Sequence, residues 1–136
     1  MNEAVQANFS SAHKTSRRYA GKHLLVDCWG CRALDDLKLM EATLKQCIVA
    51  CEASLLHLHL HQFVDNHGIS GVAVLAESHL SVHTWPETGF AAFDIFMCGR
   101  ANPERATPIL RQAFSPFKIQ MECYLRGSSP PQSSSV

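Results

Sequence analysis

The residues best suited to chemistry gather in one short stretch of this sequence. Side chains that can act as nucleophiles, acids or bases crowd together between two apolar, strand-like runs: Glu77, Ser78, His79, His83, Glu87 and Cys98. A serine hydroxyl is a nucleophile when a base activates it, imidazole is the usual base near neutral pH, and a thiol can hold or deliver a proton. A sheet alone does not need this density of polar groups, so the stretch is the candidate active site.

The order and spacing of these residues resemble the self-cleavage and active-site region of the short bacterial and archaeal S-adenosylmethionine decarboxylase proenzymes. The matching strings are Ala76-Glu-Ser-His-Leu-Ser-Val-His-Thr-Trp-Pro-Glu87 and Phe90-Ala-Ala-Phe-Asp-Ile-Phe-Met-Cys-Gly99. The resemblance is strongest over about 68–99, and Gly21-Lys-His-Leu-Leu-Val-Asp27 adds to it.

The resemblance implies a chain that makes its own prosthetic group. The Ser78 hydroxyl would attack the carbonyl of Glu77, and elimination and hydrolysis would then leave a pyruvoyl group at residue 78. This attack needs a strained turn, and the elimination needs a base. His83 matches the processing base of the family, and Ser70 matches a serine that assists cleavage by hydrogen bonding. The expected products are chains 1–77 and 78–136.

The resemblance also implies the reaction of the cleaved protein. The ketone at Ser78 would form a Schiff base with the amine of S-adenosylmethionine and accept electrons as carbon dioxide leaves, which yields the aminopropyl donor for spermidine and other polyamines. Cys98 matches the proton donor, Glu87 matches a carboxylate that contacts substrate, and Phe63 offers an aromatic face for adenine. The turn over 63–68 is about one residue longer than the usual family pattern.

Other functions share some of these residues. A pyruvoyl-dependent ornithine or arginine decarboxylase of the same fold would keep the self-processing residues and would use an acidic group such as Asp65 for a distal cation. The match to the S-adenosylmethionine decarboxylases extends beyond the self-processing residues to Glu87 and Cys98, which favours S-adenosylmethionine as the substrate. A hydrolase triad of Ser78, His83 and Asp94 is a further alternative, but no nucleophile-elbow glycines flank the serine. A processing-dead homologue or a histidine-rich metal-binding module is the non-enzyme alternative.

Four cysteines follow the pattern C-x2-C-x15-C-x3-C, which is close to that of a structural zinc site. Cys28 and Cys31 alone have redox-motif spacing, but Cys28 lies within an apolar run that is typical of a strand. Cys47 and Cys51 lie one helical turn apart in an apolar periodic stretch, where cysteine is a common core residue. We therefore expect buried thiols.

Three histidines alternate with leucines at His57, His59 and His61, so a strand would place the three imidazoles on one face. Neighbouring side chains on that face lie about 6.5–7 Å apart, so two of them could share a metal ion but the third would be strained. No carboxylate or cysteine lies nearby in the sequence to complete the shell. We expect no metal here.

Length and composition limit the number of domains, the possible partners and the location of the protein. A chain of 136 residues that is 46% hydrophobic can form one domain, which we place at 1–126, followed by a tail at 127–136 with a disordered composition. Twelve basic and twelve acidic residues cancel, so nothing indicates nucleic acid or an anionic membrane as partner. The sequence has no secretory or membrane-spanning apolar run, which favours a cytoplasmic protein.

The elements expected around the site alternate in a simple order. Periodicity predicts strands at about 22–29, 56–61, 69–76, 80–85, 90–97 and 118–125, with helices at 35–52 and from Asn102-Pro103 to Ser115. This order predicts an α+β two-layer sandwich, with one largely antiparallel sheet and two helices on one face.

The apolar run 69–76 reads as a central strand that is buried on both faces, so the second face of the sheet needs cover. A second copy of the chain is the simplest cover. The family that the sequence resembles pairs two protomers sheet to sheet with active sites at their interface, which implies a homodimer of cleaved protomers.

Overall fold

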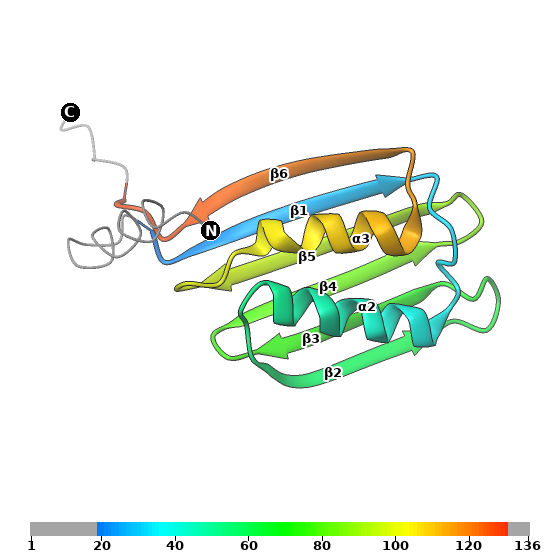
Figure 1. Cartoon of the computed structure of the whole chain (residues 1–136), viewed down its shortest axis with the longest axis horizontal. Coiled ribbons are helices and arrows are strands. Elements are labelled where there is room, and N and C mark those ends of the chain that lie inside the picture. The colour runs from blue at the N-terminus through cyan, green and yellow to red at the C-terminus, as the bar shows by residue number, and fades with distance from the viewer. Residues whose placement is uncertain (1–18, 131–136) are drawn as a thin grey trace, which may run out of the picture.

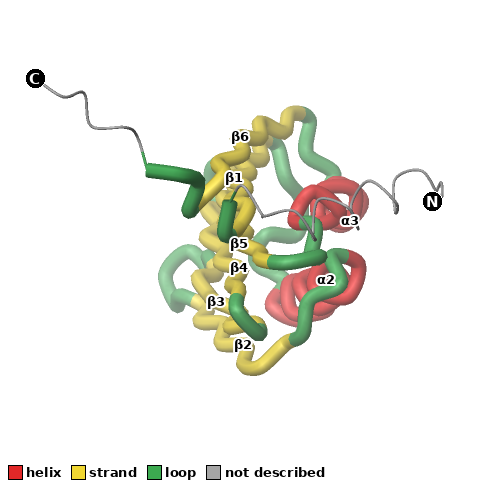
Figure 2. The backbone as a smooth tube through the Cα atoms, turned by 90° about the vertical axis from the view of Figure 1, so that its left-hand side faces the viewer, coloured by secondary structure: helices red, strands yellow, loops and turns green. Residues whose placement is uncertain are grey.

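The structure, a computed structural model, describes residues 19–130 and has two layers (Figure 1). One sheet of six strands runs in the order β2-β3-β4-β5-β1-β6, and every neighbouring pair is antiparallel. Seen along the sheet, both helices lie on the same side of it (Figure 2). The predicted α+β sandwich is therefore confirmed. The elements are β1 (Gly21–Trp29), α2 (Leu37–Ala50), β2 (Leu55–Gln62), β3 (Ile69–Leu75), β4 (Ser78–Trp85), β5 (Phe90–Cys98), η1 (Pro103–Arg105), α3 (Ala106–Phe114) and β6 (Lys118–Arg126).

Local sequence signals set where the helices begin. The Asp36 side chain caps α2 by accepting the backbone N–H of Leu39 at 3.0 Å, and the buried stripe of this helix is Met40, Thr43, Leu44, Cys47 and Ile48. The second predicted helix has its cap at Asn102, but its first turn is the 3-10 turn η1, and the α-helix proper starts at Ala106. Four residues of the predicted tail, 127–130, follow β6, and the remaining positions of that tail lie outside the described residues.

The sheet has one face covered by helices and one open face. The prediction that β3 is buried on both faces is wrong for the single chain, because Val72 and Val74 remain 39% and 43% exposed. Other large apolar side chains are exposed in the same way along β1 and β4, including Leu25 and Trp85. On this face the apolar side chains alternate with polar ones such as Ser81 and Asp94.

The helix-covered core contains Cys47 and Cys51, as expected for buried thiols. Burial raises the pKa of Cys47 to about 12 and that of Cys51 to about 11. Because the thiolate is the reactive form, we expect neither side chain to react with iodoacetamide in the native protein at pH 8, whereas exposed Cys123 is alkylated. Peptide mass mapping checks this, and rapid native alkylation at Cys47 would contradict the packing of α2.

Candidate active site

The tight turn between β3 and β4 contains the predicted cleavage position. Leu75 pairs with Ser78 across the hairpin, so only Ala76 and Glu77 form the turn. Glu77 has a φ of 63°, in the left-handed region that residues other than glycine rarely adopt. Backbone strain is therefore present at the residue whose carbonyl Ser78 would attack.

Cys98, the last residue of β5, contacts both reacting groups. Its thiol donates to the carbonyl oxygen of Glu77 at 3.0 Å, and its backbone N–H donates to the hydroxyl oxygen of Ser78 at 3.2 Å. Negative charge would develop on that carbonyl oxygen during attack, and a donor placed there stabilises it. We call Glu77, Ser78 and Cys98 the cleavage centre.

The remaining predicted site residues lie at the opposite end of β4. Ser70 of β3 pairs with His83 of β4, and the Ser70 hydroxyl lies 3.0 Å from Nδ1 of His83. After β4, the Asn66 amide contacts both carboxylate oxygens of Glu87 at 3.3 and 3.4 Å, which fixes the orientation of this carboxylate. Sequence reasoning did not identify Asn66.

Phe63 follows β2 at this end and is 46% exposed, with its ring 4.8 Å from that of His61. An exposed aromatic face near a fixed carboxylate is suited to a ligand with a flat ring and hydroxyl groups. We call Phe63, Ser70, His83 and Glu87 the binding end.

The structure does not bring the cleavage centre and the binding end of one chain together. Ser78 begins β4 and His83 is five residues further along the same extended strand, which separates them by about 17 Å. No hydrogen bond joins the two groups among the described residues. His83 therefore cannot act as the base for Ser78 of its own chain in this arrangement.

Asp94 does not complete a hydrolase triad. Its carboxylate contacts Nε2 of His23 and lies 3.7 Å from Nε2 of His79, whereas His83 bonds Ser70 instead. Sequence reasoning included His79 in the candidate stretch without giving it a role, and it did not identify His23. One sequence signal could have indicated a role for His79. His79, Ser81 and His83 alternate along one strand and therefore share its open face.

His23, His79 and Asp94 also form the one group of metal-type ligands within the described part of the chain, with their ligand atoms within 4.8 Å of one another. The four cysteines and the three β2 histidines form no such group there. The Arg126 guanidinium lies 3.0 Å from Nδ1 of His23. Because arginine only donates, this contact places the imidazole proton on Nε2, the atom that a metal ion would need. The geometry thus favours hydrogen bonding over metal binding.

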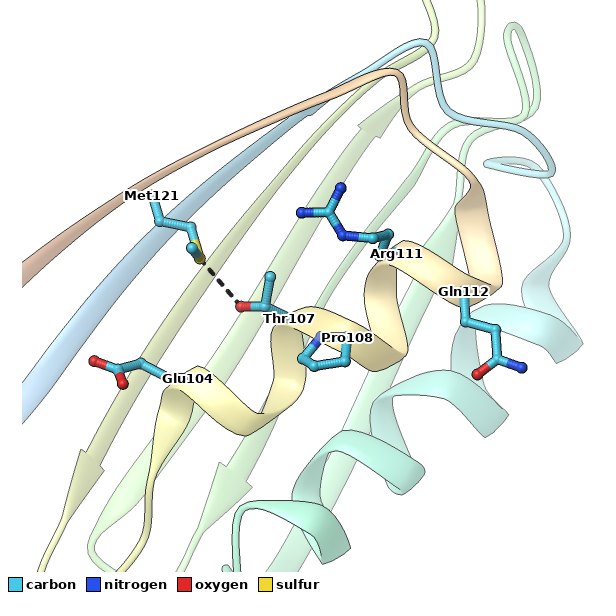
Figure 3. Close-up of a pocket in the computed structure, with 6 residues that line it drawn as sticks. All are labelled: Glu104, Thr107, Pro108, Arg111, Gln112 and Met121. Carbon is cyan, nitrogen blue, oxygen red and sulfur yellow. Dashed lines mark hydrogen bonds between the residues drawn. The ribbon is translucent and has the colours of Figure 1, made fainter.

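Two hollows differ in what lines them. A cavity of about 310 Å³ on the open face is bordered by His83 and the carboxylates of Asp27, Asp94 and Glu122. A larger one of about 460 Å³ lies between α3 and β6, where the Thr107 hydroxyl bonds the sulfur of Met121 at 3.2 Å (Figure 3). None of the predicted site residues lines the larger hollow, so size does not identify the site here.

No helix among residues 19–130 is long and apolar enough to cross a membrane.

Comparisons with known proteins indicate one family. The family model described as S-adenosylmethionine decarboxylase matches residues 22–127. The S-adenosylmethionine decarboxylase proenzyme of Thermomicrobium roseum is 43% identical over 79% of this chain and 93% of the relative, and that of Methanococcus aeolicus is 45% identical over 82% and 97%. The crystal structure of the adenosylmethionine decarboxylase from Aquifex aeolicus superposes with a TM-score of 0.74, 30% identity, and coverage of 88% of this chain and 100% of that one.

The family model covers more than half of the chain, and the relatives are matched over nearly their whole length. Together with the strained turn at Glu77 and the two contacts of Cys98, they show that this chain belongs to the S-adenosylmethionine decarboxylase family.

Proposed function

We propose that this chain is a proenzyme that cleaves itself after Glu77 and then decarboxylates S-adenosylmethionine with a pyruvoyl group made from Ser78. The observation that carries the proposal is the pair of contacts from Cys98 to the Glu77 carbonyl and the Ser78 hydroxyl. The relatives are named as proenzymes of S-adenosylmethionine decarboxylase, which favours this substrate over ornithine or arginine. The product would be the aminopropyl donor for polyamine synthesis.

Each residue of the cleavage centre has a defined task. Oγ of Ser78 adds to the carbonyl carbon of Glu77 and its proton passes to the amide nitrogen. The carbonyl oxygen takes the charge against the Cys98 thiol, and the C–N bond then breaks to leave an ester and a free amine on residue 78. A base next removes the α-proton of residue 78, and the Glu77 carboxylate departs. Hydrolysis of the resulting dehydroalanine releases ammonia and completes the group. The positive φ of Glu77 favours the first step because replacing the peptide bond by an ester relaxes the backbone at this turn.

A pyruvoyl group at residue 78 fits these surroundings and would supply the carbonyl that accepts electrons during decarboxylation. Cys98 lies next to residue 78 and can deliver a proton there after carbon dioxide has left. Glu87 and Phe63 would hold the ribose hydroxyls and the adenine ring at the binding end.

The distance between the two parts of the site supports a homodimer. Ser70, Val72 and His83 lie on the open face, which also exposes apolar side chains that a partner would cover. In a two-fold dimer packed through this face, the binding end of one chain would lie against the cleavage centre of the other. Each of the two sites would then take Ser78 and Cys98 from one copy and His83 and Glu87 from its partner.

Intact-mass measurement tests self-cleavage. The wild-type protein is expected to give two polypeptides, 1–77 and 78–136, the second without a free amino group, and to release carbon dioxide from S-adenosylmethionine but not from ornithine or arginine. Ser78→Ala should remain a single chain with no activity. Ser81→Ala, which changes a serine on the same strand outside the cleavage centre, is the matched control and should cleave normally. A wild-type chain that stays uncut would contradict the proposal.

Glu87→Gln tests the binding end separately. Losing a charged acceptor for substrate hydroxyls is expected to raise the KM for S-adenosylmethionine about tenfold or more, since hydrogen bonds to charged groups contribute about 1.5–3 kcal/mol. Self-cleavage should be unchanged. Steady-state kinetics on the cleaved protein provide the measurement, and an unaltered KM would remove Glu87 from substrate binding. Asn66→Ala, which only frees the carboxylate, should have a smaller effect.

A further inference from the structure

Two histidine rings flank one phenylalanine on the open face beside the cleavage centre. In the sheet register, Phe96 of β5 pairs with His23 of β1 on one side and with His79 of β4 on the other. The His79 ring stacks on Phe96 with centroids 5.6 Å apart and planes at 28°, while the His23 ring meets it edge-on at 5.5 Å and 74°. The His23 and His79 rings also meet edge-on, with centroids 6.0 Å apart, so the three rings form a compact triangle contributed by three strands.

A series of polar contacts runs through this ring cluster. Arg126 donates to Nδ1 of His23, Nε2–H of His23 donates to Asp94, and the same Asp94 oxygen faces Nε2 of His79 at 3.7 Å. Because the arginine fixes the tautomer of His23, the direction of these hydrogen bonds is set from one end. The His79 ring is thus held by its stack on Phe96 and by the carboxylate together.

His79 is bonded directly to the residue that becomes the prosthetic group. Before cleavage, the hairpin turn and the Cys98 N–H hold Ser78 in place. Cleavage after Glu77 removes the turn, so residue 78 becomes a chain end, and chain ends lose order unless neighbouring residues are tied down. Cys98 lies two residues beyond Phe96 on the same strand, so the ring cluster supports both residue 78 and the residue that would deliver the proton.

We propose that His79 is a positioning residue that fixes residue 78 against Cys98, and that the Arg126–His23–Asp94 chain of contacts holds His79 in that role. This inference rests on the proposed function. It assigns a task to four side chains that the cleavage chemistry leaves without one.

A double-mutant cycle tests the proposal on the full-length protein. His79→Phe keeps a ring on Phe96 but loses the contact with Asp94, and Asp94→Asn keeps the shape of the carboxylate but not its charge. Each change is expected to slow carbon dioxide release by the cleaved protein about tenfold, because small displacements of reacting groups cost one to two orders of magnitude in rate. Self-cleavage should change less, because the hairpin turn still holds Ser78 at that stage. The double variant should be no slower than either single variant, since both remove one interaction.

Two further measurements separate positioning from general damage. In nitrogen-15 spectra of histidine-labelled protein, His23 should be protonated at Nε2 in the wild type, and Arg126→Ala should weaken this preference, which Asp94 then supports alone. Glu41→Gln, which alters an exposed carboxylate of α2 that pairs with Lys45, is the matched control and should release carbon dioxide at the wild-type rate. Melting temperatures identify any variant that is merely unstable.

The outcomes are distinct. Coupled tenfold losses of turnover in folded variants that still cleave, with normal turnover in Glu41→Gln, support the proposal. Normal turnover in His79→Phe or Asp94→Asn, or rate losses that multiply in the double variant, overturn it. If the wild-type chain itself does not cleave, the proposed function fails, which is a different result from equal turnover in wild type and variants.

Discussion

In a heterodimer of a Ser78→Ala chain and a His83→Ala chain, only the His83→Ala chain is expected to cleave. About 17 Å of extended strand separates the two residues within one protomer, so the proposed site takes Ser78 from one copy and His83 from the other. In this heterodimer, one site contains both native residues and the other contains neither. Different affinity tags on the two chains allow the heterodimer to be purified and each chain to be weighed by mass spectrometry.

The reverse pairing gives the control. A wild-type chain paired with a Ser78→Ala/His83→Ala chain has one native residue at each shared site, so neither chain should cleave. A site built within one protomer predicts the opposite in both experiments: no cleavage in the first heterodimer and cleavage of the wild-type chain in the second. The two results together therefore decide whether the site is shared, whichever chain is the more stable.

The sequence predicts most of the fold because local signals determine it. The alternation of Leu56 to His61 fits β2, and Asp36 and Asn102 cap the helical segments as expected. The errors have local causes too. Pro103 starts a 3-10 turn, which delays α3 by one turn, and β3 appears fully buried in sequence although a single chain covers only one of its faces. The apolar sequence of β3 indicates that both of its faces need cover, but it does not indicate whether the same chain or a second one supplies that cover.

The candidate site is less predictable because its contacts join distant strands. The spacing of Glu77, Ser78 and Cys98 is enough to group these residues, and the β4–β5 pairing brings them together. The same spacing places His83 near Ser78 in sequence, but five residues of strand are much longer than five residues of helix. The contact of Asp94 with His23 spans 71 positions and depends on β1 pairing with β5, which no local pattern encodes.

Cys98→Ala is expected to impair the two stages of the reaction to different extents. The thiol donates to the Glu77 carbonyl, but sulfur is a weak donor and the backbone N–H that holds Ser78 remains, so self-cleavage should slow only about tenfold. Turnover by the cleaved protein should fall by about a hundredfold or more, because general acid catalysis typically contributes that much. Time courses of chain splitting and single-turnover release of carbon dioxide measure the two stages.

Cys98→Ser separates the two tasks of the thiol. A hydroxyl can donate to the Glu77 carbonyl, so cleavage should return to near the wild-type rate, but a hydroxyl is a far weaker acid than a thiol, so turnover should stay low. Cys123→Ala, which removes an exposed cysteine of β6, should alter neither stage. If Cys98→Ala turns over at the wild-type rate after cleavage, Cys98 is not the proton donor, and its role is confined to the oxygen of Glu77. If both variants cleave normally but only the serine variant turns over, protonation needs a hydrogen-bonding group at this position rather than an acidic one.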